Sequence, residues 1–121
     1  MAPHPALAVH GALSRGVLSV VVLLSLAVLF APASDVPTAP AGVDKLVHGA
    51  LFAALALSGR WAGIGRVALT TALVGYAAVS EVVQGLVGRD AAVGDLVADV
   101  VGLLLGLALW QLVDRREAAP R

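Results

Sequence analysis

The sequence predicts an all-α fold, a four-helix transmembrane bundle with short loops and both termini in the cytoplasm. The first reason is composition, because 60% of the 121 residues are hydrophobic and only 13% are charged. So few polar side chains cannot cover the surface of a soluble domain. The second reason is that four long apolar runs are separated by short polar segments. The runs do not alternate between polar and apolar residues, so helices are favoured over barrel strands.

The first predicted span covers residues 16–33, follows a cytoplasmic segment at 1–15, and carries no charged side chain. Its length is close to the ~20 residues that cross a bilayer. A second interpretation is open here. Arg15, the apolar run and Ala31-Pro32-Ala33 also resemble a signal peptide with its cleavage site. Cleavage would leave three spans.

Three further spans are expected at residues 45–62, 67–88 and 91–113, and a polar cytoplasmic tail at 114–121. The histidine and acidic residues that lie within these spans, rather than at the span ends, are His48, Glu81, Asp95 and Asp99. The loops between the runs are short, so residues 16–113 form one transmembrane domain.

The basic residues predict the orientation. If the helices alternate in direction, one side holds Arg15, Arg60, Arg66, Arg115, Arg116 and Arg121, and the other holds Lys45 and Arg89. Cytoplasmic loops are enriched in Lys and Arg. We therefore expect both termini and residues 59–66 inside, and residues 34–43 and 89–94 outside.

Polar residues gather in the outer halves of the spans. They are Asp44, Lys45, His48, Glu81, Gln84, Arg89, Asp95 and Asp99. A charge at the bilayer centre costs about 2.5–3.5 kcal/mol even on the lenient scale, so such residues indicate a functional site by default. We interpret the eight as a binding or functional cluster. Simpler roles stay open for Lys45 and Arg89, which could extend to the interface, and for His48, which could be a structural residue.

The helical rise places these residues in two layers. Glu81 and Asp99 lie roughly 10 and 12 Å below the outer loop, and Gln84 and Asp95 about 6 Å below it. His48, four residues after Asp44, belongs near the upper layer. We expect Glu81 and Asp99 to share a proton, a cation or a basic neighbour, because two like charges in lipid repel each other strongly.

Gly102 and Gly106 continue the helical stripe of Asp95 and Asp99. Their G-x-x-x-G spacing predicts close helix packing on that face. The lipid is expected to meet the other face, which carries Leu96, Val100, Leu103, Leu104 and Leu107.

Three motifs follow one another along the chain. They read Asp44-Lys45-x-x-His48-x-x-x-Phe52, then Glu81-x-x-Gln84 followed by Arg89, then Asp95-x-x-x-Asp99-x-x-Gly102-x-x-x-Gly106. In this order they resemble the VanZ-like family of small bacterial membrane proteins, named for a teicoplanin-resistance protein. Asn is frequent in that family at the position of Asp99. The resemblance implies a multi-pass protein of the bacterial cell membrane with a role in the cell envelope or in glycopeptide resistance. It does not imply a reaction.

Three functions are compatible with these residues. The first is an envelope protein whose outward-facing pocket binds a lipid headgroup, a lipid-linked cell-wall precursor or a lipoglycopeptide. The second is an enzyme acting on a lipid-linked substrate. Its candidate acids, bases or ligands of a divalent cation are Asp44, His48, Glu81, Asp95 and Asp99. The third is a proton or cation pathway, which the apolar cytoplasmic half disfavours.

Composition excludes several other functions. The net charge is zero, whereas nucleic-acid binders normally carry a basic excess. The chain contains no cysteine, so disulfides, thiolate metal sites and cysteine nucleophiles are excluded. The sequence requires no cofactor, although a divalent cation is compatible with its oxygen-rich cluster.

Overall fold

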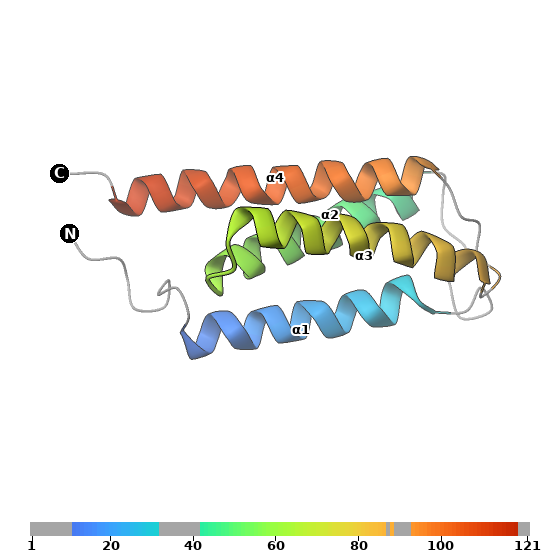
Figure 1. Ribbon diagram of the computed structural model, residues 1–121, viewed down its shortest axis with the longest axis horizontal. Coiled ribbons are helices and arrows are strands. Elements are labelled where there is room, and N and C mark those ends of the chain that lie inside the picture. The colour runs from blue at the N-terminus through green and yellow to red at the C-terminus, as the bar shows by residue number, and fades with distance from the viewer. Residues whose placement is uncertain (1–10, 32–41, 87, 89–92, 119–121) are drawn as a thin grey trace.

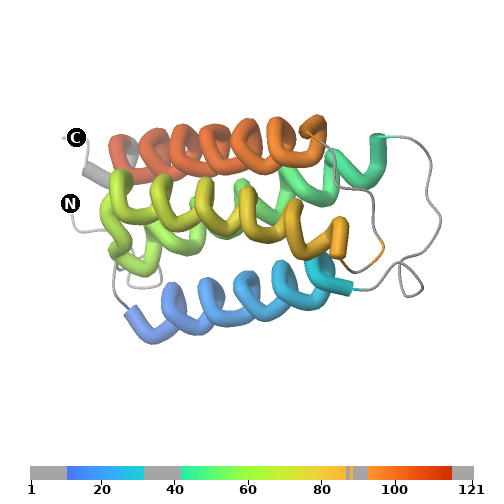
Figure 2. Tube along the Cα trace, turned by 45° about the vertical axis from the view of Figure 1, so that its right-hand side comes forward, coloured from blue at the N-terminus to red at the C-terminus, as the bar shows by residue number. Residues whose placement is uncertain are grey.

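The computed structural model describes residues 11–31, 42–86, 88 and 93–118, with side chains as far as Arg115. Within these residues the chain is entirely helical. The helices are α1 (Ala12–Leu29), α2 (Val43–Trp61), α3 (Arg66–Leu86) and α4 (Val93–Ala118). They lie along a common long axis and successive helices run in opposite directions (Figure 1). As a result, α2 and α4 run parallel to each other (Figure 2).

Three helices, α1, α3 and α4, are long and apolar enough to cross a membrane. By the length and composition of these helices, the chain is a multi-pass membrane protein. The helix α2 does not meet the same criterion, because its 19 residues include Asp44, Lys45 and Arg60. The predicted second span at 45–62 thus corresponds to a helix whose crossing of the membrane is not shown.

The helix ends differ from the predicted spans by a few residues. α1 ends at Leu29 rather than at residue 33, because Pro32 follows closely and disfavours helical geometry in the residue before it. α4 continues to Ala118, into the segment that the sequence analysis assigned to the cytoplasmic tail. Arg115, Arg116 and Glu117 are good helix formers, and basic residues also suit the C-terminal end of a helix.

α2 holds the bundle together. It contacts each of the other three helices and packs most closely against α4. At their crossing, a methyl group added at Gly102 would clash with the carbonyl of Gly49, and one added at Gly106 would lie 2.5 Å from the carbonyl oxygen of Ala53. The two backbones approach this closely only because both glycines lack a side chain, as in other small-residue helix crossings.

The buried apolar core lies between these helices. It consists of Leu29, Phe52, Leu55, Ala56, Leu69, Leu73, Ala77 and Leu103. The expectation that Leu103 faces lipid is wrong, since only 1% of this residue is exposed. Leu103 lies four residues after Asp99 and next to Gly102, so the face that meets α2 is wide enough to include it. Leu96 and Leu107 are half-buried against the core, whereas Leu104 is exposed as expected.

The two ends of the bundle differ in charge. The end where α1 and α3 begin and α2 and α4 finish carries Arg15, Arg60, Arg66 and Arg115. A side-chain hydrogen bond of 2.8 Å from Arg60 Nη1 to the carbonyl of Ile64 supports the turn between α2 and α3 there. The opposite end carries the acidic residues of the predicted cluster (Figure 1).

Candidate functional site

Two rows of polar side chains meet where α2 and α4 begin. Asp44 and His48 are four residues apart on α2, and Asp95 and Asp99 are four residues apart on α4. This spacing places each pair on one face of its helix. Because the two helices run parallel and their glycine contact brings them close, the two rows lie side by side. Glu81 joins them from the last turns of α3.

His48 and Asp99 form the closest polar contact of the cluster. The Nδ1 atom of His48 lies 2.7 Å from Oδ1 of Asp99, and the two side chains are 1% and 0% exposed. A carboxylate at this position accepts a hydrogen bond from Nδ1–H. That bond fixes the orientation of the ring and leaves Nε2 as the atom available for other contacts.

The Nε2 atom of His48 faces two further carboxylates. It lies 3.8 Å from Oδ2 of Asp44 and 4.0 Å from Oδ2 of Asp95. Neither distance is a hydrogen bond, and Nε2 has no hydrogen-bond partner within the part of the chain that the structure describes. The site is open on this side, because the Asp44 side chain is 51% exposed whereas that of Asp95 is 5% exposed.

Among the described residues, Lys45 supplies a positive charge at this side of the cluster. Its Nζ atom lies 3.4 Å from Oδ1 of Asp95, and its side chain is 53% exposed. The aliphatic part of Lys45 crosses directly over Gly94, where a Cβ atom would lie 2.7 Å from Cε. A side chain at position 94 would therefore displace the lysine from Asp95. The sequence analysis did not consider Gly94, although its place immediately before Asp95 on α4 is a signal of this contact.

Glu81 lies at the buried side of the cluster. It is 9% exposed, and a carboxylate oxygen of Glu81, one of Asp99 and a ring nitrogen of His48 all lie within 4.8 Å of one another. The predicted proximity of Glu81 and Asp99 is therefore present in the structure. His48 reaches this deeper layer as well as the upper one, which the depth estimate alone did not indicate.

Gln84 makes a contact that was not predicted. It donates a hydrogen bond of 3.0 Å from Nε2 to the carbonyl oxygen of Leu29 in the last turn of α1. The last carbonyls of a helix are available to side chains from other helices. Gln84 therefore joins α3 to α1.

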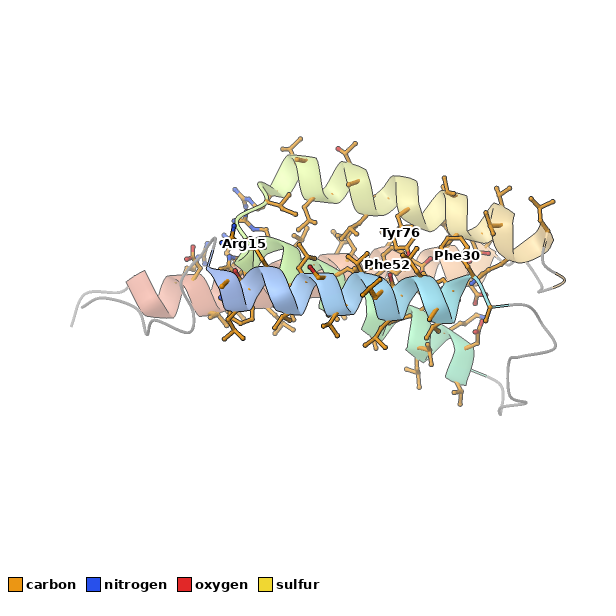
Figure 3. All side chains as sticks on the ribbon, turned by 90° about the horizontal axis from the view of Figure 1, so that it is seen from below. Arg15, Phe30, Phe52 and Tyr76 are labelled. Atoms are coloured by element: carbon orange, nitrogen blue, oxygen red, sulfur yellow. The ribbon has the colours of Figure 1, made fainter. Side chains whose placement is uncertain are left out.

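A group of aromatic residues packs close to the same end of α1. The hydroxyl of Tyr76 lies 2.8 Å from Oγ of Ser25, and its ring centroid lies 5.7 Å from that of Phe52 and 6.0 Å from that of Phe30. Figure 3 shows these rings together toward one end of α1 and Arg15 at the other. Tyr76 therefore packs against rings from α2 and the end of α1 and also joins α1 to α3 by a hydrogen bond.

Arg89 and most of the two predicted outer loops cannot be placed, because residues 34–41 and 89–92 lie outside the residues that the structure describes.

Gly102 and Gly106, which were predicted to serve helix packing, lie directly against α2. Gly102 meets Gly49, and Gly106 meets Ala53 and Ala56. Gly49 was not predicted, although it follows His48 directly.

The described part of the cluster is rich in acidic groups. It contains Asp44, Glu81, Asp95 and Asp99, together with Lys45 and His48. Buried acidic groups are stable when they are paired, bound to a cation or protonated. The arrangement is therefore suited to holding a cation or a positively charged group, and His48 Nε2 adds a nitrogen ligand or a proton acceptor.

Comparisons with known proteins give no family assignment. No family model, curated protein or solved structure matches this chain.

Proposed function

We propose that this protein is a VanZ-like component of the bacterial cell membrane, with both termini and the arginine-rich end in the cytoplasm. In this proposal α2 also crosses the membrane, so that the bundle has four membrane-crossing helices. The six-to-two distribution of basic residues supports the orientation. The close packing of α2 against three helices, all of which are long and apolar enough to cross a membrane beside it, supports the crossing of α2.

The polar cluster then faces outward, where it binds a polar group presented at the outer leaflet. The candidates are a lipid headgroup, a lipid-linked cell-wall precursor or a teicoplanin-type lipoglycopeptide. The observation that carries this proposal is the gradient from half-exposed Asp44 and Lys45 to the fully buried His48–Asp99 pair. Such an arrangement offers charged groups at the surface and oriented polar groups beneath them, which is the usual character of a specific binding site.

The direct test is teicoplanin susceptibility of a sensitive bacterium that expresses the chain. We expect the wild-type protein to raise the inhibitory concentration several-fold, and His48→Ala and Asp99→Ala to return it to the vector level at equal membrane abundance. Asp114→Ala is the matched control, because Asp114 is exposed and lies near the other end of α4. Unchanged susceptibility, together with no binding of a lipid-linked precursor to the purified protein, would contradict the proposal.

One observation favours a second candidate, an enzyme acting on a lipid-linked substrate. A histidine that is oriented by a carboxylate on Nδ1, and whose buried Nε2 has no hydrogen-bond partner among the described residues, has the arrangement of a general base. Turnover of the precursor by the wild-type protein, lost in His48→Ala, would favour the enzyme. Binding of the precursor without turnover would favour the binding protein.

A further inference from the structure

We propose that Asp44, His48 and Asp95 form a site for one divalent transition-metal ion, with Asp99 orienting the imidazole ligand. The three donor atoms come from the first turns of α2 and α4 and all lie within 4.8 Å of one another. The proposal concerns the same cluster as the proposed function, but it rests on the geometry of these residues and its test uses the metal alone.

The distances suit a single ion. Ligands held about 2.1 Å from a tetrahedral metal lie about 3.4 Å apart. His48 Nε2 is 3.8 Å from Asp44 Oδ2 and 4.0 Å from Asp95 Oδ2, so each pair needs to contract by about half an ångström. Asp44 is half-exposed, and a small rotation of its side chain can shorten its distance to His48. The His48–Asp95 pair needs a small shift of α2 against α4.

The buried imidazole supplies independent support for a metal ligand. The His48 side chain is 1% exposed, and its Nε2 atom is directed at the two carboxylates without a hydrogen-bond partner among the described residues. Burying a polar nitrogen in this way is costly unless a ligand satisfies it. Meanwhile Asp99 holds Nδ1 at 2.7 Å. Metal-binding histidines almost always donate their second ring N–H to a carboxylate, a carbonyl or a water molecule in this manner.

The donor set indicates the class of metal. One imidazole nitrogen and two carboxylate oxygens suit Zn²⁺ or Mn²⁺, whereas Ca²⁺ and Mg²⁺ prefer oxygen ligands alone. Lys45 occupies Oδ1 of Asp95, which leaves Oδ2 as the oxygen that faces the proposed ion. Three protein ligands leave at least one coordination position for water or for an anionic group of a bound molecule.

The test uses the full chain without an affinity tag, purified in detergent or nanodiscs. His4 and His10 are first replaced by alanine, because the chain has three histidines and these two would otherwise compete for the metal. Equilibrium dialysis against Zn²⁺ or Mn²⁺ should give one ion per chain. We expect His48→Ala and Asp95→Asn to weaken metal binding at least tenfold. Asp99 does not touch the metal in this proposal, but Asp99→Ala should weaken metal binding roughly 10–100-fold because the imidazole ligand loses its orientation. Asp114→Asn should have no effect.

A spectroscopic measurement keeps the proposal testable if the His48 variant does not fold. In the background lacking His4 and His10, His48 is the remaining histidine of the chain. The electron spin echo of bound Mn²⁺ should therefore show the nitrogen modulation of a single imidazole ligand. Absence of that modulation with Mn²⁺ bound would overturn the proposal. Failure to bind one ion per chain, or Ca²⁺ binding as tightly as Zn²⁺ in both the wild type and His48→Ala, would do the same.

Discussion

Gly102 of α4 packs directly against the carbonyl group of Gly49 on α2. The position next to Gly49 is His48, and Asp99 lies one helical turn before Gly102, so this backbone contact sets the separation across which His48 and Asp99 form their 2.7 Å contact. The closest packing of the bundle and the centre of its polar cluster are therefore one structural unit. This coupling makes the cluster sensitive to substitutions that carry no charge.

Replacement of Gly102 by alanine should destabilise the bundle and disturb the polar cluster. The added Cβ would collide with backbone atoms of Gly49, and overpacking of this kind typically costs about 1–3 kcal/mol. The free energy of unfolding, measured by titration with a denaturing detergent, tests this directly. Gly75→Ala is the matched control, because a Cβ at this exposed glycine of α3 meets no atom within 4 Å. Equal stability of the two variants would contradict the close crossing.

Substitutions of Asp99 should separate the hydrogen bond from the charge. Asp99→Asn retains an oxygen that accepts the hydrogen bond from His48 Nδ1, whereas Asp99→Ala leaves this buried nitrogen without an acceptor. A buried donor without a partner costs about 1–3 kcal/mol, so the alanine variant should unfold more readily than the asparagine variant by about this amount. The same detergent titration measures both. If the two variants were equally unstable, the contact would contribute little as a hydrogen bond.

The Tyr76–Ser25 contact should contribute modestly to the attachment of α1. Its 2.8 Å hydrogen bond joins α3 to α1, and such bonds between membrane helices average about 0.6 kcal/mol. A double-mutant cycle with Tyr76→Phe and Ser25→Ala isolates that energy. A coupling energy near zero would show that this hydrogen bond does not help to hold α1 in the bundle.

Single cysteines should reveal the orientation, since the native chain contains none. Gly65→Cys lies in the turn before α3, where an added side chain meets open space, and Val93→Cys lies at the start of α4, where the residue is 79% exposed. In intact cells a membrane-impermeant thiol reagent should label position 93 and not position 65. The reverse pattern would place the polar cluster in the cytoplasm.

The fold followed from the sequence because apolarity determines which residues can lie in lipid. The pattern of apolar residues predicted the four helices, but the positions of the helix ends depend on other forces. α1 stops at Leu29 ahead of Pro32, and α4 continues through Arg115, because backbone hydrogen bonds and helix propensity do not stop at the edge of an apolar run. Likewise, the charged residues Asp44, Lys45 and Arg60 lie at the ends of α2 and do not interrupt the helix.

The candidate site was partly predictable for a similar reason. The four-residue spacings of Asp44 with His48 and of Asp95 with Asp99 place each pair on one face, whatever the tertiary structure. Depth alone did not show which faces meet. The parallel packing of α2 on α4 aligns His48 with Asp99, and Gln84 donates to the carbonyl of Leu29. The glycine spacing of α4 predicted a close contact, but not that its partner is α2, and the contact of Gln84 depends on where α1 ends.

In the proposed function, the buried acids Glu81 and Asp99 act with His48 as one outward-facing binding unit. The most direct measurement is the affinity of the purified protein in nanodiscs for a lipid-linked cell-wall precursor, compared among wild type, Glu81→Ala, Asp99→Ala and the double variant. Because a carboxylate oxygen of each acid and a nitrogen of His48 lie within 4.8 Å of one another, each single substitution should abolish binding, and the double variant should bind no worse than either. Partial losses that simply add, or full affinity in either single variant, would contradict the account.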